Sequence, residues 1–177
     1  MPFYDFFRKY CFNFATPPQR VSVQQFSFYL SSEGEAQGCC GHSLNRNLND
    51  KTTMIEIGLK HISEMTVTDQ VTAIAMGSGD MAVLATPAMM ALMENAAMLA
   101  VAPELPEGCT TVGGHIESSH LRPTAVGQRV TAIAEVTRIE GKKIEFAVSA
   151  YAGDTLIGEG THLRFVVDRD RFMSRLG

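Results

Sequence analysis

Residues 84–103, Leu-Ala-Thr-Pro-Ala-Met-Met-Ala-Leu-Met-Glu-Asn-Ala-Ala-Met-Leu-Ala-Val-Ala-Pro, decide the fold of this 177-residue chain. Thr86 can cap a helix, and Pro87 suits the first helical position because its missing N–H would have no partner there. Pro103 disfavours helical geometry at the residue before it. We therefore predict a helix over residues 87–102, about 24 Å long at a rise of 1.5 Å per residue.

The predicted helix is apolar on every side. Its polar side chains beyond the cap are Glu94 and Asn95, in the middle. A helix of this kind is expected to be wrapped by other structure, because an exposed helix carries only one apolar stripe. It is also shorter than the ~20 residues of a membrane span and carries a charge at its centre. The sequence thus predicts a buried helix and no membrane partner.

Composition excludes several classes of function. The formal charge is −4 and no basic run occurs, which argues against nucleic acid or an anionic membrane as the main partner. The four cysteines, at positions 11, 39, 40 and 109, show no C-x-x-C spacing. Nothing in them requires structural zinc or an oxidising compartment. We expect a cytoplasmic protein with no metal and no cofactor.

The composition changes near Met54. Ten of the fourteen Phe and Tyr residues lie in the first thirty positions without a clear period, and residues 31–53 are polar and rich in turn formers. We interpret residues 1–53 as an N-terminal extension without a fold of its own, either poorly ordered or a mis-assigned start upstream of Met54. An arm docked on the core is the alternative. Residues 54–177 are predicted to form one domain.

The rest of the chain alternates in the manner of strands. Residues 62–71 form a first candidate before the helix, and residues 77–80 form a turn. Four further strands follow the helix without another helix between them, at residues 110–121, 128–139, 143–151 and 156–167. Alternate residues in the second of these four, such as Val130 and Ala132, indicate one buried face. We predict an α+β fold, an antiparallel sheet of about five strands curled round one helix.

Three segments carry a family resemblance: Ala-Thr-Pro-Ala-Met-Met-Ala-Leu-Met-Glu-Asn-Ala-Ala at 85–97, residues 111–127, and Gly-Glu-Gly-Thr-His-Leu-Arg-Phe-Val-Val at 158–167. They resemble the hotdog fold and, within it, the acyl-CoA thioesterases related to fluoroacetyl-CoA thioesterase. The resemblance covers most of residues 56–173. It implies a single hotdog domain that hydrolyses a small or medium acyl-CoA to the free acid and CoA, as a homodimer or higher oligomer.

The resemblance also implies a set of site residues. Thr86, Glu94 and His120 match catalytic positions. Gly113 would lie against the thioester. Without the family, Gly113 and Gly114 indicate either a bulge or close strand–helix approach, the commoner meaning of glycine in a strand, or space that admits the acyl group. Arg164 matches a position near the ligand.

The chemistry of three of these residues indicates possible roles without the family resemblance. Burial among apolar neighbours would raise the pKa of Glu94 toward the range of a general base, although a structural ion pair is the alternative. Thr86 is fully explained as an N-cap, yet an N-cap hydroxyl beside the helix dipole can also stabilise an oxyanion. His120 alone would be an ordinary histidine, and only the resemblance favours a catalytic role. We interpret His115 and His162 as structural.

The spacing of the site residues constrains the mechanism. Thr86 and Glu94 are eight residues apart, about 12 Å along a straight helix, so one imidazole cannot hydrogen-bond both within one chain. Either residues from two chains meet, or Glu94 acts without touching Thr86. The sequence leaves open a covalent acyl intermediate and direct attack by water. Open strand edges and a helix that one sheet covers only in part predict the homodimer.

Two other functions, an enoyl-CoA hydratase and an acyl-CoA sensor, fit the sequence less well. A hotdog hydratase would carry an Asp and His pair at the start of the helix, but no His occurs between His61 and His115. A non-catalytic acyl-CoA sensor would carry an attached DNA-binding or effector unit, and residues 1–53 show no helix-turn-helix pattern or basic patch. A free-thiol assay over several acyl-CoAs separates the three.

The resemblance bears on the substrate as well. Its fluoroacetate-selective pattern places an aromatic lid residue a few positions before the threonine, and residues 79–85 contain no aromatic. Met81, Val83 and Leu84 offer a pliable apolar surface instead, to which Met90 and Met93 can add. We expect a graded preference among short and medium acyl groups rather than selectivity for fluoroacetyl-CoA.

Overall fold

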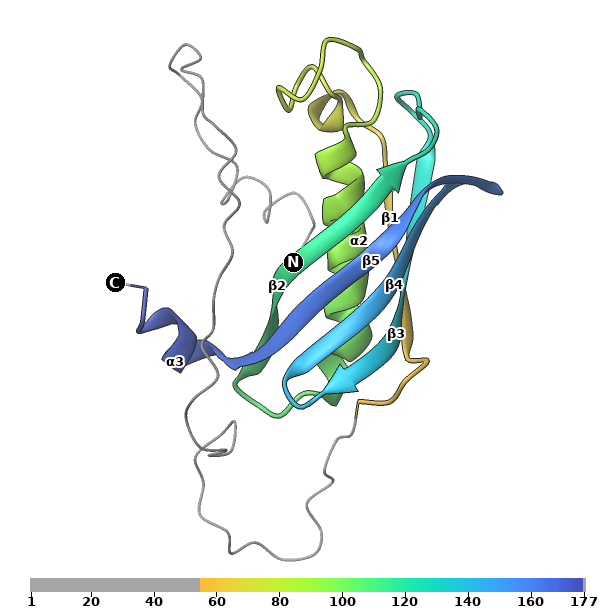
Figure 1. The fold of residues 1–177 in the computed structure, drawn as a ribbon. Coiled ribbons are helices and arrows are strands. Elements are labelled where there is room, and N and C mark those ends of the chain that lie inside the picture. The colour runs from red at the N-terminus through yellow and green to blue at the C-terminus, as the bar shows by residue number, and fades with distance from the viewer. Residues whose placement is uncertain (1–54, 177) are drawn as a thin grey trace, which may run out of the picture. The chain divides into compact units, whose positions relative to one another are not determined.

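The computed structural model describes residues 55–176 (Figure 1). The strands are β1 (Lys60–Thr66), β2 (Cys109–His120), β3 (Arg129–Glu140), β4 (Lys143–Ala152) and β5 (Thr155–Asp168). The long helix is α2 (Thr86–Val101), and the short helices are η1 (Asp69–Val71), η2 (Ala102–Glu104) and α3 (Arg169–Met173). The predicted extension over residues 1–53 lies outside the described residues.

The five strands form one antiparallel sheet in the order β1-β3-β4-β5-β2. Two-residue turns join β3 to β4 and β4 to β5, and Gly141 and Gly153 take positive φ there, which tight hairpins favour. The sheet curls along α2, with β1 and β2 at its two edges (Figure 1). The predicted α+β class, a sheet of five strands with one long helix, is confirmed.

One face of the sheet packs on α2. The predicted alternation in β3 is confirmed, because its buried residues are Val130, Ala132, Ala134 and Val136. The helix buries the side that carries Ala88, Met89, Leu92, Met93, Ala96 and Ala97. Its other side, with Met90, Ala91 and Met98, is only half-buried. Asn95 in the middle accepts a hydrogen bond from Ser63 on β1, at 2.7 Å. A single chain therefore covers one side of α2, which agrees with the expectation that one sheet covers the helix only in part.

The element ends correct several expectations. Helix α2 begins at Thr86, and its N-cap is Ala85, without a side-chain cap hydrogen bond, so the prediction that Thr86 caps the helix is wrong. Ala102 keeps helical φ and ψ angles and is the first residue of η2. The expectation that Pro103 would force Ala102 out of helical geometry is therefore wrong. The first strand ends at Thr66 rather than at residue 71, where η1 lies instead. The other four strands agree with the prediction to within one residue, and α3 was not predicted.

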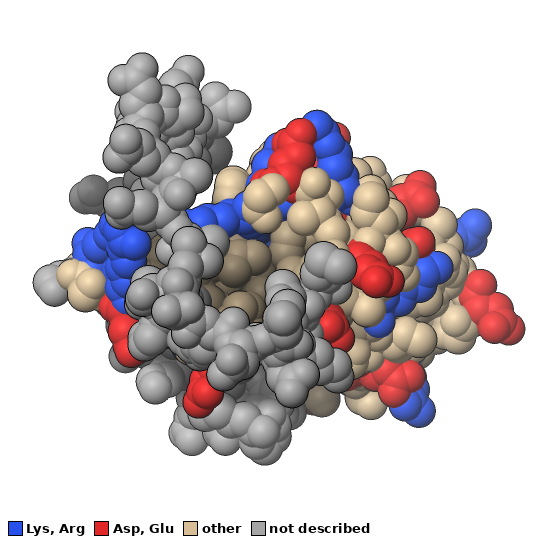
Figure 2. All heavy atoms as spheres, turned by 90° about the horizontal axis from the view of Figure 1, so that it is seen from below, with Lys and Arg blue, Asp and Glu red and all other residues tan. Residues whose placement is uncertain are grey.

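Charge is mixed on the surface. On the face shown in Figure 2, acidic and basic side chains are interspersed rather than gathered into one basic patch. Within residues 55–176, every helix is too short or too polar to cross a membrane.

Candidate functional site

The first cluster of predicted site residues is a hydrogen-bonded pair at the start of α2. Thr86 is the first residue of the helix and His120 is the last residue of β2. Thr86 Oγ1 lies 2.9 Å from His120 Nδ1. Because Thr86 does not cap the helix, its hydroxyl can form this hydrogen bond with the imidazole instead. The structure thus brings together two of the three predicted catalytic side chains, and we call them the Thr86–His120 pair.

His120, the second member of the pair, is half-buried. Burial lowers its pKa below the ordinary value for histidine, and the backbone of Arg122 acts in the opposite sense. The imidazole is therefore neutral at pH 7. Its Nε2 is buried and has no hydrogen-bond partner among the described residues. Buried polar atoms are rarely left unpaired, and the exceptions concentrate at functional sites.

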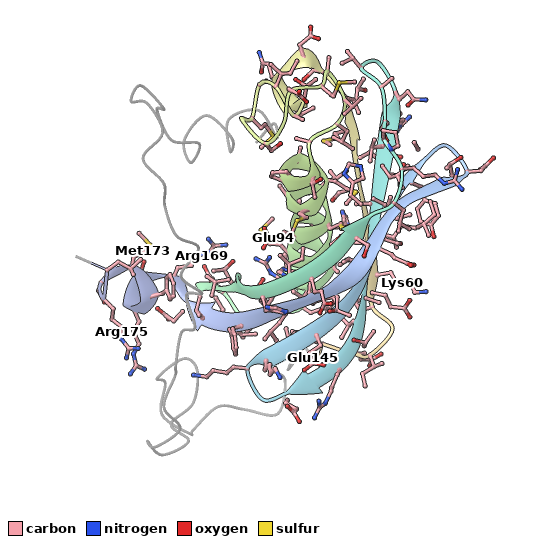
Figure 3. The ribbon with its side chains drawn as sticks, turned by 45° about the horizontal axis from the view of Figure 1, so that its top comes forward. Lys60, Glu94, Glu145, Arg169, Met173 and Arg175 are labelled. Carbon is pink, nitrogen blue, oxygen red and sulfur yellow. The ribbon has the colours of Figure 1, made fainter. Side chains whose placement is uncertain are left out.

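Glu94 lies about midway along α2 (Figure 3). Its Oε1 is 3.5 Å from His162 Nε2 and 4.0 Å from Arg164 Nη1. Burial raises the pKa of the Glu94 carboxyl, and the Arg164 guanidinium opposes this rise. The side chain nevertheless keeps 41% of its surface exposed in the single chain. A carboxylate that is partly desolvated and still accessible is suited to accept a proton from water.

Arg164 is fixed by hydrogen bonds. It is buried, with 6% of its surface exposed. Its Nε donates to Thr111 Oγ1 at 2.8 Å and its Nη2 donates to the Thr111 carbonyl at 2.9 Å. Its Nη1 donates to the Glu94 carbonyl at 3.4 Å. The side chain predicted to bind substrate therefore lies beneath the carboxylate, where it braces β2 against α2.

His162 is held between these groups. Its Nδ1 is 2.7 Å from the His115 carbonyl and its Nε2 is 3.1 Å from Arg164 Nη1. Arginine can only donate, so Nε2 accepts, and Nδ1–H donates to the carbonyl. Burial is the main cause that lowers the pKa of His162, to about 4, so the ring is neutral at pH 7. We call Glu94, His162 and Arg164 the Glu94 cluster.

Two adjacent glycines on β2 have different roles. A Cβ at Gly113 would lie 2.6 Å from Glu94 Oε1, which is closer than real Cβ contacts come. A Cβ at Gly114 would instead meet the Phe165 ring at 2.5 Å, and the strand register shifts between Gly113 and His115. Gly113 thus gives the carboxylate room, while Gly114 accommodates a bulge.

The pair and the cluster are separate within one chain. Thr86 and Glu94 lie about 12 Å apart along the helix. On β2, Gly113 beside the cluster and His120 in the pair are seven residues apart, roughly 23 Å at about 3.3 Å per residue. As the spacing predicted, one imidazole does not reach both residues: His120 contacts Thr86, and His162, which was not predicted there, approaches Glu94. One chain therefore carries two separate clusters of predicted site residues, which we refer to as the two half-sites.

The sequence interpretation did not connect His162 with Glu94. The available signal was its position two residues before Arg164 on β5, because alternate residues of a strand share a face. The structure shows that both side chains reach Glu94.

A groove of about 550 Å³ is lined by strand residues such as Glu117, Glu135, Ser149 and Glu159, and the predicted site residues are not among those that line it. No three His, Cys, Asp or Glu side chains of residues 55–176 come together as a metal site would require.

A curled five-stranded antiparallel sheet on one central helix, with a carboxylate in the middle of that helix and a threonine at its start, defines a hotdog-fold thioester hydrolase. The family model described as fluoroacetyl-CoA-specific thioesterase matches residues 67–170. The chain belongs to this family.

Known relatives agree with this assignment. Fluoroacetyl-CoA thioesterase of Streptantibioticus cattleyicolor is 38% identical over 94 residues, which are 53% of this chain and 68% of that protein. A solved structure of a fluoroacetyl-CoA thioesterase matches with a TM-score of 0.65 at 30% identity, over 70% of this chain and 96% of the other. A Thermus thermophilus protein described as a thioesterase superfamily member matches with a TM-score of 0.63 at 27% identity, over 69% and 90%.

Proposed function

We propose that this thioesterase hydrolyses small and medium acyl-CoA thioesters to the free acid and CoA, using Glu94, Thr86 and His120. One observation carries the proposal. The Glu94 carboxylate lies half-buried at the centre of the fold, and the strand residue against it, Gly113, has no side chain. Burial raises the pKa of this carboxyl, and a stronger base at neutral pH results.

Glu94 acts as the general base in this mechanism. It takes a proton from water as the water oxygen adds to the acyl carbon, and the carbonyl electrons move to the oxygen. The oxyanion then collapses, the carbon–sulfur bond breaks, and the CoA sulfur leaves with the electron pair. The proton held by Glu94 is passed to that sulfur. The balance is one thioester and one water to one acid and one thiol.

The Thr86–His120 pair stabilises the oxyanion. When His120 Nδ1–H donates to Thr86 Oγ1, the threonine O–H is free to donate to the thioester oxygen. The first backbone N–H groups of α2 and the positive end of its dipole lie beside this hydroxyl. Preorganised donors of this kind stabilise the negative charge that develops on the oxygen in the transition state.

We propose that a homodimer joins the two half-sites. Strand β2 is a sheet edge with unpaired backbone groups. Antiparallel pairing of β2 with the same strand of a second copy, centred near Ile116, would set Gly113 opposite the partner's His120. Glu94 of one protomer would then face the Thr86–His120 pair of the partner subunit. The half-buried side of α2 would be covered by the same contact.

Subunit complementation tests this arrangement. Glu94→Gln and His120→Asn chains with different affinity tags are co-expressed, and the heterodimer is isolated. If a site takes residues from two chains, one of the two sites in the heterodimer is intact, and about half of the wild-type activity returns. If each site lies within one chain, the heterodimer stays as inactive as either homodimer, and the two-chain site is wrong. A folded, active monomer at micromolar concentration would exclude the dimer itself.

The acyl specificity is proposed to be graded. Met81 is exposed and Val83 is half-buried beside the start of α2, but Leu84 is in the core, so the expectation that Leu84 lines the surface is wrong. Flexible apolar surfaces discriminate by about 1–3 kcal/mol per methylene. We expect kcat/KM to vary gradually over acetyl-, butyryl- and hexanoyl-CoA in a free-thiol assay. A preference for fluoroacetyl- over acetyl-CoA far beyond their ratio in alkaline hydrolysis would refute this.

A further inference from the structure

Arg164 and Glu94 are neighbours that do not form a close ion pair. Their closest side-chain atoms, Nη1 and Oε1, are 4.0 Å apart, whereas hydrogen-bonded arginine–carboxylate pairs approach to about 2.7–2.9 Å. The same Nη1 lies 3.1 Å from His162 Nε2. A buried guanidinium beside a carboxylate would be expected to turn toward it, so the longer distance needs a cause.

The hydrogen bonds of the guanidinium supply that cause. Two of its nitrogens are bound to Thr111, through the side chain and the backbone carbonyl. The third, Nη1, divides its donors between the Glu94 carbonyl and the His162 ring. The ring in turn is anchored by its donation to the His115 carbonyl. The guanidinium is planar and rigid, so Nη1 can approach Glu94 only if the whole group rotates. The hydrogen bond from Nη1 to His162 opposes that rotation, together with the two bonds to Thr111.

We propose that neutral His162 is a positioning residue that engages the Arg164 guanidinium and keeps it from closing on the Glu94 carboxylate. This inference rests on the proposed role of Glu94 as general base. A carboxylate bonded directly to arginine is a weak base, because an opposite charge at close range lowers a carboxyl pKa by about 1–3 units. His162 thus keeps the positive charge near the site while leaving the carboxylate able to take a proton.

The other groups around Glu94 do not replace this effect. Among the described residues, His162 and Arg164 are the basic side chains within 4.0 Å of the carboxylate. Strand β2 presents Gly113 to it, and its titratable side chains are His115, Glu117 and His120. Strand β1 contacts α2 through Ser63 and also carries Lys60, His61 and Glu64. The buried residues of β3 and β4 are apolar: Val130, Ala132, Ala134, Val136, Ile144, Phe146, Val148 and Ala150.

The experiment measures kcat/KM against pH for the full-length enzyme and three variants. His162→Leu removes the acceptor and keeps much of the volume. His162→Gln retains a carbonyl acceptor for Arg164. Phe146→Leu is the matched packing control, because the Phe146 ring lies 6.3 Å from the His162 ring and carries no polar atom. If the leucine variant does not fold, His162→Asn, whose shorter amide draws back from Arg164, takes its place.

In His162→Leu we expect the acid limb of the profile to move to lower pH by about one unit or more, with the plateau about tenfold lower. His162→Gln is expected to keep the limb near its wild-type position, and Phe146→Leu to lower stability without moving it. A limb that stays in place in His162→Leu overturns the inference, provided that Glu94→Gln is inactive. A fully active Glu94→Gln enzyme would instead overturn the proposed function. A carbon-13 titration of the Glu94 carboxyl in the same variants reads the pKa directly.

Discussion

The two half-sites hold their polar groups in opposite ways. The Thr86–His120 pair rests on one hydrogen bond at the surface end of α2. In the Glu94 cluster, buried His162 and Arg164 are fixed by five hydrogen bonds to Thr111, His115, Glu94 and each other. A hydroxyl that donates to a substrate oxygen needs only one hydrogen bond to orient it. A positive charge beside a general base needs several hydrogen bonds, because it must be kept at a distance from the carboxylate. Loss of the pair should affect activity alone, and changes in the cluster should affect both activity and pH dependence.

Glu94→Gln is expected to have the largest effect, a fall in kcat of about 10²-fold or more, since general acid–base groups contribute about 10²–10⁴-fold. Glutamine keeps the shape but cannot take a proton. Thiol release under saturating substrate measures kcat, and circular dichroism checks that the variant is folded. Wild-type turnover would show that the carboxylate is only structural.

Acid should weaken the fold through His162. Its folded pKa is about 4 against an ordinary 6.5, so between these values the unfolded chain binds more protons. The stability that the neutral ring contributes is thus complete above about pH 6.5 and is lost as pH falls toward 4. At 1.36 kcal/mol per unit the loss is at most about 3 kcal/mol. Urea unfolding at several pH values measures it, and His162→Gln, which cannot titrate, should show a smaller slope. If the free energy of unfolding depends on pH equally in the wild type and in His162→Gln, His162 is not the group responsible.

Gly113→Ala should lower kcat about tenfold, because the new Cβ would lie 2.6 Å from Glu94 Oε1 and would displace the base. It would also lie 3.3 Å from His162 Cε1, so we expect some loss of stability, but less than in a variant that clashes with backbone. Gly160→Ala is the contrasting variant. Its Cβ would lie 1.9 Å from the Glu117 backbone carbonyl, so the sheet itself must shift. We expect thermal unfolding to distinguish an inactive folded protein from an unfolded one. Full activity in Gly113→Ala would mean that Glu94 does not need its present position.

Thr86→Ala should lower kcat by up to about tenfold, the effect of losing one hydrogen bond of about 0.5–1.5 kcal/mol. Because Thr86 is exposed and does not cap α2, the melting temperature should not change. Thr86→Ser, which keeps the hydroxyl, is the control and should retain most of the activity. A marked loss of stability in the alanine variant would show that the side chain supports the helix after all.

Removing residues 1–53 is predicted to have the smallest effect. The described sheet, helix and both half-sites lie within residues 55–176, and the family match covers residues 67–170. The shortened protein should form the same oligomer with the same kcat/KM, as judged by size-exclusion chromatography and thiol release. Insoluble or inactive protein would indicate that the N-terminal segment packs on the domain.

The sequence predicted the elements because they depend on local signals. Alternation of apolar residues placed four strands to within one residue, and the prolines bracketed α2. The end of the first strand was missed because Asp69 and Val71 continue the alternation but form a turn of 3₁₀-helix. Thr86 was misassigned as the cap because a threonine before proline has that propensity, while the competing partner, His120, comes from 34 residues along the chain.

By itself, the sequence determined the α+β class, the central helix with its lone carboxylate, and the resemblance that pointed to Thr86, Glu94 and His120. Only the tertiary structure decided that the three residues divide into two half-sites, that Arg164 lies under the carboxylate, and that His162 stands between them. The physical reason is the distance along the chain over which each interaction acts. Helix and strand formation follows periodicity over a few residues, whereas the distances from Glu94 to His162 and Arg164 depend on how β5 and β2 pair beside α2.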